Sequence, residues 1–362
     1  MSSAQILFGV TLIIVLGVAA QWLAWRLHVP SILLLLLFGF LGGPIAGQLQ
    51  PDALFGELLL PFVSVSVGLI LYEEGLSLRL TELPKVGGVV RNLVTTGAFV
   101  TWAISTLASA WLFDLPGELA VLLGAILVVT GPTVIQPLLQ HIRPSGATGS
   151  ILKWEGIVID PVGALLAVLV FEAVSAGELR EATAHVLGGV LKTIIVGGGL
   201  GVVAAGMLSF ALRRYWVPDF LQNAVSLMLV LATFAASNAA QHESGLFAAT
   251  VMGITLANQR SVDVRHIVEF KENLRVLLIS GLFIVLAARL EVSSLLAVSF
   301  RGMVLVLLLV AVARPLCVWV STVRSKLSAK ERLFLSAMAP RGIVAAAVAS
   351  VFAIRLEQIG YE

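Results

Sequence analysis

Apolar runs separated by short polar connections fill the whole chain. Most runs reach about 20 residues, the length that an α-helix needs to cross the hydrocarbon core of a bilayer. Hydropathy and turn signals therefore predict about twelve membrane-spanning helices. Their approximate limits are 5–25, 30–48, 55–78, 86–113, 117–140, 151–176, 184–212, 219–240, 244–258, 270–290, 295–323 and 332–356. No polar stretch is long enough for a soluble domain, so residues 1–362 are expected to form one membrane unit.

Basic residues fall alternately on the two sides of this predicted arrangement. With the N-terminus outside, the outer connections carry only Arg180, Arg289, Arg301 and Arg355. The inner connections carry Arg26; Arg79, Lys85 and Arg91; Arg143 and Lys153; Arg213 and Arg214; Arg260, Arg265, Lys271 and Arg275; and Arg324, Lys326, Lys330 and Arg332. This is the positive-inside pattern, and it predicts an outer N-terminus.

Composition agrees with a polytopic membrane protein. Of the 362 residues, 59% are hydrophobic and 12% are charged, and that charged fraction is about half of the value usual for soluble domains. The single cysteine, Cys317, excludes an intrachain disulfide. No G-x-x-x-x-G-K-[ST] motif is present, so nothing indicates that ATP drives the protein. We expect no enzymatic activity, no cofactor and no nucleic-acid partner.

Asp160 is the strongest candidate for chemistry, because it lies inside the apolar sixth run, which extends from Gly156 to Phe171. A carboxylate at membrane depth is costly, and such residues usually mark an ion or proton pathway. Pro161 has no N–H, so it leaves the carbonyl of Ile157 free and is expected to interrupt the helix. A proton and a monovalent cation would compete for the same oxygens, which is sufficient for antiport. The alternative is a structural carboxylate bound by neighbouring hydroxyls.

Two further spans contain predicted helix breaks. In the fifth span, Gly131-Pro132 would free the carbonyl of Val128, and in the twelfth, Pro340 and Gly342 flank an arginine. Interrupted helices in corresponding halves point to the midplane site of a secondary transporter. These two spans lie seven segments apart and run in opposite directions, as expected of an inverted repeat.

Other polar residues near these breaks have predicted roles. Thr130 and Thr133 offer oxygen ligands to a monovalent cation beside Asp160, although threonine hydroxyls also bond back to their own helix. Glu155 lies on a different face of the sixth span from Asp160. We predict that Glu155 pairs with Arg341, in a role that is structural or gating, because a buried charge requires a partner.

Three more charged residues lie in or near the predicted spans. Glu73 and Glu74 are predicted to extend from the inner end of the third span to the membrane interface. Arg314 is either a packing residue of the eleventh span or part of the ion pathway, and the sequence leaves both roles open.

The motifs together resemble the cation:proton antiporter superfamily, and most closely its NhaP-type branch. The resemblance is carried by five motifs that occur in the expected order: Leu71-Tyr-Glu-Glu74-Gly-Leu-Ser77, Thr130-Gly-Pro-Thr133, Glu155-Gly-Ile-Val-Ile-Asp160-Pro, Gly281-Leu-Phe-Ile and Ala-Pro-Arg341-Gly342. It covers nearly the whole chain.

The resemblance implies an all-α polytopic inverted-repeat transporter with two broken, crossing helices (an NhaA/NhaP-like fold). It implies interleaved dimerisation and core subdomains, a homodimer in a bacterial inner membrane, and exchange of Na⁺ or K⁺ for H⁺. The family's aspartate, glutamate, arginine and threonine fall on Asp160, Glu155, Arg341 and Thr130. A thirteenth span, and in some relatives a nucleotide-binding regulatory domain in the cytoplasm, would follow residue 362.

Two departures from the family pattern bear on the ion. Gly131 stands where the family has an aspartate, and Ile159 where it has an asparagine. With Asp160 as the single titrating carboxylate, we expect electroneutral one-for-one exchange, with the choice between Na⁺ and K⁺ open. The alternatives are a cation-coupled symporter of an organic anion and a membrane sensor that does not transport.

Overall fold

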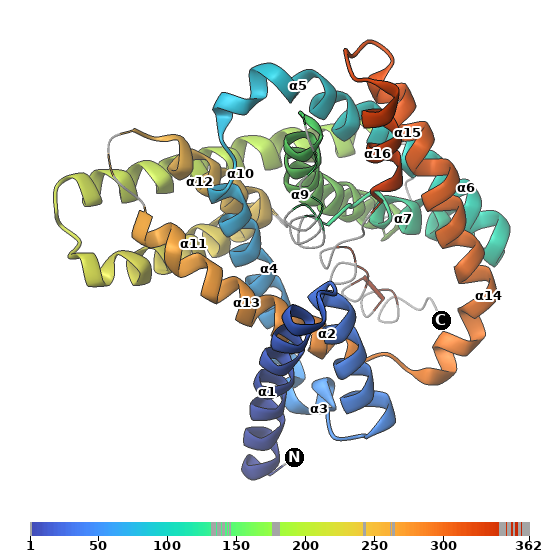
Figure 1. The fold of residues 1–362 in the computed structure, drawn as a ribbon, viewed down its shortest axis with the longest axis horizontal. Helices are drawn as coiled ribbons and strands as arrows, with labels where there is room; N and C mark the ends of the chain where they lie inside the picture. The colour runs from blue at the N-terminus through green and yellow to red at the C-terminus, as the bar shows by residue number, and fades with distance from the viewer. Residues whose placement is uncertain are drawn as a thin grey trace.

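The computed structural model describes residues 2–131, 135, 139, 142, 144, 146–175, 182–241, 244–260, 262, 265–339, 345, 349, 352, 353 and 356. All regular structure in these residues is helical (Figure 1). The α-helices are α1 (Ser3–Leu27), α2 (Ser31–Phe40), α3 (Pro51–Phe55), α4 (Leu59–Leu76), α5 (Leu83–Asn92), α6 (Ala98–Phe113), α7 (Gly117–Ile126), α9 (Thr148–Ser175), α10 (Ala182–Arg213), α11 (Gln222–Ala240), α12 (Ser244–Asn258), α13 (Arg265–Ala288), α14 (Val292–Leu308), α15 (Arg314–Thr322) and α16 (Ala329–Ala337). Short 3₁₀ or π segments are η1 (Leu41–Ile45), η2 (Gly56–Leu58), η3 (Leu80–Glu82), η4 (Leu93–Gly97), η5 (Asp219–Leu221) and η6 (Leu309–Ala313).

The helices match the predicted spans closely. Among the described residues, seven helical segments are long and apolar enough to cross a membrane: Ser3–Leu27, Pro51–Leu76, Leu80–Phe113, Thr148–Phe171, Leu191–Arg213, Asp219–Ala240 and Phe300–Thr322. Four shorter apolar segments, Ser31–Ile45, Gly117–Ile126, Ser244–Asn258 and Leu274–Ala288, correspond to the second, fifth, ninth and tenth predicted spans. Twelve of the 25 residues of the twelfth predicted span, among them Pro340, Arg341 and Gly342, lie outside the described residues.

The helices pack into two groups. Helices α1–α4 and α10–α13 contact one another and form the first group, at the left and bottom of Figure 1. Helices α5–α7, α9 and α14–α16 form the second group, at the top and right. The two groups meet mainly where α9 contacts α4, α10 and α12. The sixth span therefore stands at the boundary between them.

Small residues allow α4 and α12 of the first group to approach closely. A Cβ on Gly253 would lie 2.2 Å from the carbonyl oxygen of Tyr72, and one on Gly75 would lie 2.6 Å from that of Thr250. Contacts this short exclude any side chain, and small residues at helix interfaces are typical of membrane bundles.

Irregular helical turns interrupt the fourth and eleventh spans at related positions. The π segment η4 joins α5 to α6, and η6 joins α14 to α15. The two spans touch beside η4, where Asn92 donates to the carbonyl of Ser321 at 3.2 Å and the Ser321 hydroxyl donates to the carbonyl of Asn92 at 3.2 Å. Like the two predicted breaks, these spans lie seven segments apart, which agrees with an inverted repeat.

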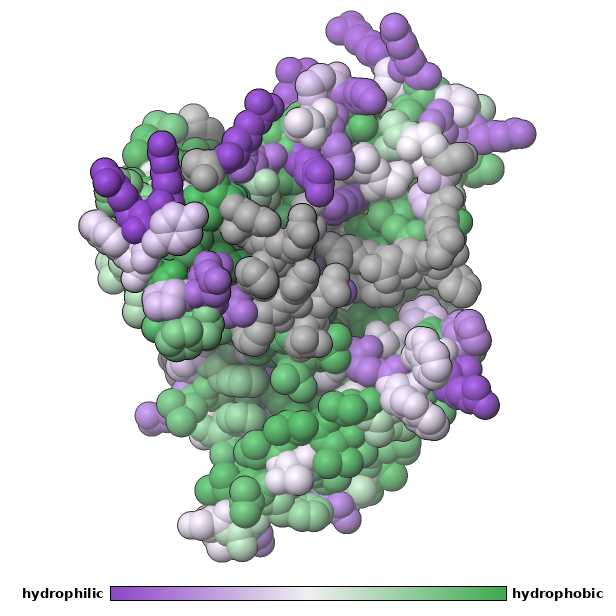
Figure 2. All heavy atoms as spheres, turned by 60° about the vertical axis from the view of Figure 1, so that its left-hand side comes forward, coloured by the Kyte–Doolittle hydropathy of each residue, from purple (hydrophilic) through white to green (hydrophobic). Residues whose placement is uncertain are grey.

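The outer surface carries many large hydrophobic side chains. Figure 2 shows a broad hydrophobic area on one face, with hydrophilic residues gathered toward its edges. Exposed aromatic residues include Trp22, Trp111 and Phe220. Exposed apolar surface of this extent is what contact with lipid requires, because in water it would favour aggregation.

Candidate functional site

Helix α9 is the most enclosed of the long spans. Its apolar window is 83% buried, against 22–39% for the other six long segments. Most of its surface therefore faces protein on both sides, since α9 packs against the first group as well as within its own. Polar side chains on α9 are held away from both lipid and bulk water.

Asp160 lies on α9 with 1% of its surface exposed. Neither carboxylate oxygen has a hydrogen-bond partner within the described part of the chain. A buried carboxylate is normally satisfied by several hydrogen bonds, and one that is not is a strong candidate for binding a proton or a cation.

Glu74 on α4 interacts electrostatically with Asp160, and the like charges of the two carboxylates repel each other. Glu74 is 2% exposed, so the prediction that it reaches the membrane interface is wrong. Glu73 is also buried, and it pairs with Arg275 of α13 at 3.6 Å. The position of Glu74 near the end of a span is compatible both with the membrane interface and with the protein interior, so the sequence alone does not predict its burial.

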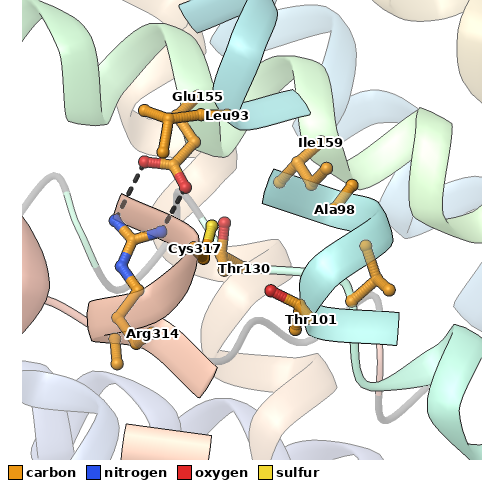
Figure 3. A pocket seen from close by; sticks show the side chains of 10 residues that line it. Leu93, Ala98, Thr101, Thr130, Glu155, Ile159, Arg314 and Cys317 are labelled. Atoms are coloured by element: carbon orange, nitrogen blue, oxygen red, sulfur yellow. Dashed lines mark hydrogen bonds and ion pairs between the residues drawn. The ribbon is translucent and has the colours of Figure 1, made fainter. Parts of the chain in front are cut away.

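The opposite face of α9 carries a buried ion pair between Glu155 and Arg314 (Figure 3). Arg314 Nη1 donates to Glu155 Oε1, Nη2 donates to Oε2 at 2.9 Å, and Nε donates to the carbonyl of Leu335 at 3.1 Å. The side chains are 3% and 5% exposed. One arginine thus ties α9, α15 and the end of α16 together.

This pair corrects the predicted partner of Glu155. The sequence analysis paired it with Arg341, whereas Arg314 occupies both of its carboxylate oxygens. Arg341 itself lies outside the described residues. Both arginines follow or precede a proline within a span, and a sequence gives no distance by which to choose between them.

The fifth span is interrupted next to this pair. Helix α7 ends at Ile126, and residues 127–131 are not helical. Val128 and Thr130 line a small pocket together with Glu155 and Arg314 (Figure 3). The Thr130 hydroxyl is buried without a hydrogen-bond partner among the described residues, and predicted residues Pro132 and Thr133 lie outside them.

The break packs directly on α9, and Gly163 is what permits the contact. A Cβ on Gly163 would lie 2.4 Å from Cγ2 of Val129. Gly163 is three residues beyond Asp160, so the irregular backbone at Val129 lies within about one helical turn of the carboxylate along the α9 axis.

Pro161 does not break α9. The helix continues from Thr148 to Ser175 with Pro161 inside it, so the predicted interruption at this residue is wrong. Proline is tolerated in membrane helices when neighbouring groups satisfy the carbonyl one turn earlier. That carbonyl belongs to Ile157, whose side chain is fully buried.

Asp160 and Glu155 therefore face different surroundings on one helix. Five residues apart, they project about 140° from each other. Asp160 faces Glu74 of the first group, and Glu155 faces Thr130 and Arg314 of the second. The neutralised pair holds the second group together, whereas Asp160 lies where the two groups meet.

This fold and site define a secondary ion transporter of the inverted-repeat type. The model of the family described as "Sodium/hydrogen exchanger, transmembrane" matches residues 10–356. The chain belongs to this family, as the motif resemblance predicted.

Individual relatives agree. The chain is 28% identical over 355 residues to "Na(+)/H(+) antiporter 1" of Methanocaldococcus jannaschii, covering 95% of this chain and 82% of that one. It is 27% identical to "K(+)/H(+) antiporter NhaP" of Alkalimonas amylolytica, covering 91% of this chain and only 57% of that longer relative. The solved structure of the sodium proton antiporter MjNhaP1 from M. jannaschii superposes with a TM-score of 0.81 at 25% identity, covering 99% of this chain and 88% of that chain.

Proposed function

We propose that this protein exchanges Na⁺ or K⁺ for H⁺ across the membrane, with Asp160 as the site that the cation and the proton share. The observation that carries the proposal is the burial of Asp160 inside a spanning helix with both oxygens unpartnered among the described residues. The relatives named as Na⁺/H⁺ and K⁺/H⁺ antiporters support the choice of cargo.

The cation would bind where the two groups meet. Asp160 supplies carboxylate oxygens from α9, and Glu74 supplies a second carboxylate from α4. The carbonyl of Ile157, which Pro161 cannot bond, adds a neutral oxygen one turn away. Oxygen ligands of this kind suit hard cations. Thr130, Thr133 and Val128 stay predicted ligands from the broken fifth span.

Alternating access follows from the position of α9. If the second group moves as a unit along the first, Asp160 travels with it and faces each side of the membrane in turn. The Glu155–Arg314 pair would keep α9, α15 and α16 together during that movement. The second group is allowed to move only when Asp160 carries a proton or a cation. This restriction couples the proton flux to the cation flux.

Glu74 is a second buried carboxylate in the region of Asp160, so the stoichiometry of exchange depends on how many of the two change their charge. In the proposed cycle only the Asp160 carboxylate changes its charge. Either one proton or one monovalent cation neutralises it. The exchange is electroneutral on this account.

The assembly and the membrane placement are also part of the proposal. The basic residues support an outer N-terminus, and we propose a homodimer in a bacterial inner membrane. The symporter and sensor alternatives are not favoured, because the named relatives are antiporters.

Flux through liposomes tests the proposal. The protein is reconstituted with an internal pH dye, a proton gradient is imposed, and Na⁺, K⁺ or Li⁺ is added in turn. Wild type should dissipate the gradient with its preferred cation, and Asp160→Asn should not. Exposed Glu57→Gln is the matched control and should behave as wild type. An equal response from Asp160→Asn would refute the role of Asp160.

A further inference from the structure

Lys153 joins the two helix groups at the predicted cytoplasmic end of the site. It lies on α9, and its Nζ donates a 2.6 Å hydrogen bond to the carbonyl oxygen of Ser77. Ser77 is the C-cap of α4. The C-terminal carbonyls of a helix carry partial negative charge, so they attract an ammonium group.

The contact lies on the same line as the carboxylate pair. Lys153 precedes Asp160 by seven residues, or about two turns, and therefore shares its face of α9. Ser77 follows Glu74 by three residues on α4. Any sliding of α9 along α4 that moves Asp160 must also pull Lys153 away from Ser77.

The short connection after α4 is fixed to the first group. Asn258, at the end of α12, donates to the carbonyl of Leu78 at 2.9 Å and accepts from the N–H of Leu80 at 2.8 Å. The Ser77 carbonyl thus belongs to the stationary side of the boundary, and the bond from Lys153 crosses that boundary.

Glu82 offers Lys153 a second acceptor, at the start of a helix of the second group. The Glu82 carboxylate attracts Lys153 electrostatically, and its buried Oε2 has no hydrogen-bond partner among the described residues. Glu82 ends η3 and leads directly into α5, a helix of the second group that packs on α9. Glu82 and Lys153 would therefore move together.

We propose that Lys153 is a two-position latch. It binds the Ser77 carbonyl in the arrangement described here and transfers to the Glu82 carboxylate when α9 moves along α4. The second acceptor offsets the loss of the first, since an ammonium left without a partner in a half-buried site would oppose the movement. The inference rests on the proposed exchange function and on the predicted orientation of the membrane.

Hydrogen exchange in purified protein tests the first position without any transport. Backbone amides in residues 77–82 should exchange about tenfold faster in Lys153→Met than in wild type, and Lys153→Arg should restore protection. Lys85→Met, which removes an exposed lysine from the first turn of α5, is the control and should leave exchange unchanged. Equal protection in Lys153→Met and wild type would overturn the first position.

Liposome flux tests the transfer. Glu82→Gln should slow turnover about tenfold. The Ser77 carbonyl of the first group is then the one strong acceptor left for Lys153, and binding to it opposes the movement. Adding Lys153→Met to Glu82→Gln should recover most of the rate, because the tether itself is gone. A double variant as slow as Glu82→Gln would overturn the transfer. Loss of flux in wild type would count against the proposed function instead, and would leave the hydrogen-exchange result standing.

Discussion

Arg314 holds both carboxylate oxygens of Glu155 while Asp160, five residues further along the same helix, has no hydrogen-bond partner in the described part of the chain. The two acidic residues of one motif thus have opposite roles. Glu155 is fully compensated and joins three helices, whereas Asp160 keeps its oxygens available at the boundary between groups.

Breaking the buried pair should destabilise the protein strongly. Arg314→Met leaves the Glu155 charge buried and uncompensated, which costs about 3–5 kcal/mol. The thermal unfolding midpoint in detergent should fall markedly, and Glu155→Gln combined with Arg314→Met should recover much of the loss. Arg301→Met removes an exposed 3.9 Å contact with Asp114 and should change stability by less than about 1 kcal/mol. A stable Arg314→Met single variant would contradict this assignment.

Glu74 should contribute to cation affinity. Replacing it with glutamine removes a buried carboxylate beside Asp160, so the apparent KM for the cation in liposome flux should rise about tenfold. Turnover at saturating cation should be largely kept, because Asp160 is intact. An unchanged KM would place Glu74 outside the binding site.

The α4–α12 contact should tolerate no side chain at Gly253. Gly253→Ala forces a Cβ to within 2.2 Å of the Tyr72 carbonyl, and the thermal midpoint should fall. Gly206→Ala on α10 meets nothing within 4 Å, and it should be neutral or slightly stabilising, because alanine favours helix. Equal effects of the two substitutions would mean that the helices do not pack this closely.

The start of α16 should respond to acid. Hydrogen bonds from the backbone N–H and hydroxyl of Ser328 lower the pKa of the exposed Glu331 carboxyl. A lowered pKa in the folded state means that the cap stabilises above the ordinary value of about 4.3 and that this contribution is lost as the pH falls through the lowered value. Carboxyl NMR of ¹³C-glutamate-labelled protein, assigned with Glu331→Gln, should show the shift. Ser328→Ala removes the hydroxyl but keeps the backbone N–H, so the pKa should rise part of the way toward the ordinary range, and a titration that Ser328→Ala leaves unaltered would count against the contribution of the hydroxyl.

Sequence reasoning succeeded where one residue determines the outcome by itself. An aspartate inside an apolar run, Asp160, and a Gly131-Pro132 step within a span each have few physical explanations. It failed where two segments had to be matched in space. Two intramembrane arginines, Arg314 and Arg341, are possible partners of Glu155 in the sequence. The packing of the helices places Arg314 against it. Glu74 was assigned to the interface because its distance from the end of α4 says nothing about the helices that pack around α4 and bury it.

Proton release on cation binding tests the central claim most directly. Purified protein in weakly buffered detergent solution is mixed with saturating Na⁺ or K⁺, and a soluble pH dye reports protons. If one site serves both ions, wild type should release up to about one proton per bound cation, and Asp160→Asn should release none. Cation binding without proton release in wild type, or full release in Asp160→Asn, would contradict a shared site at Asp160.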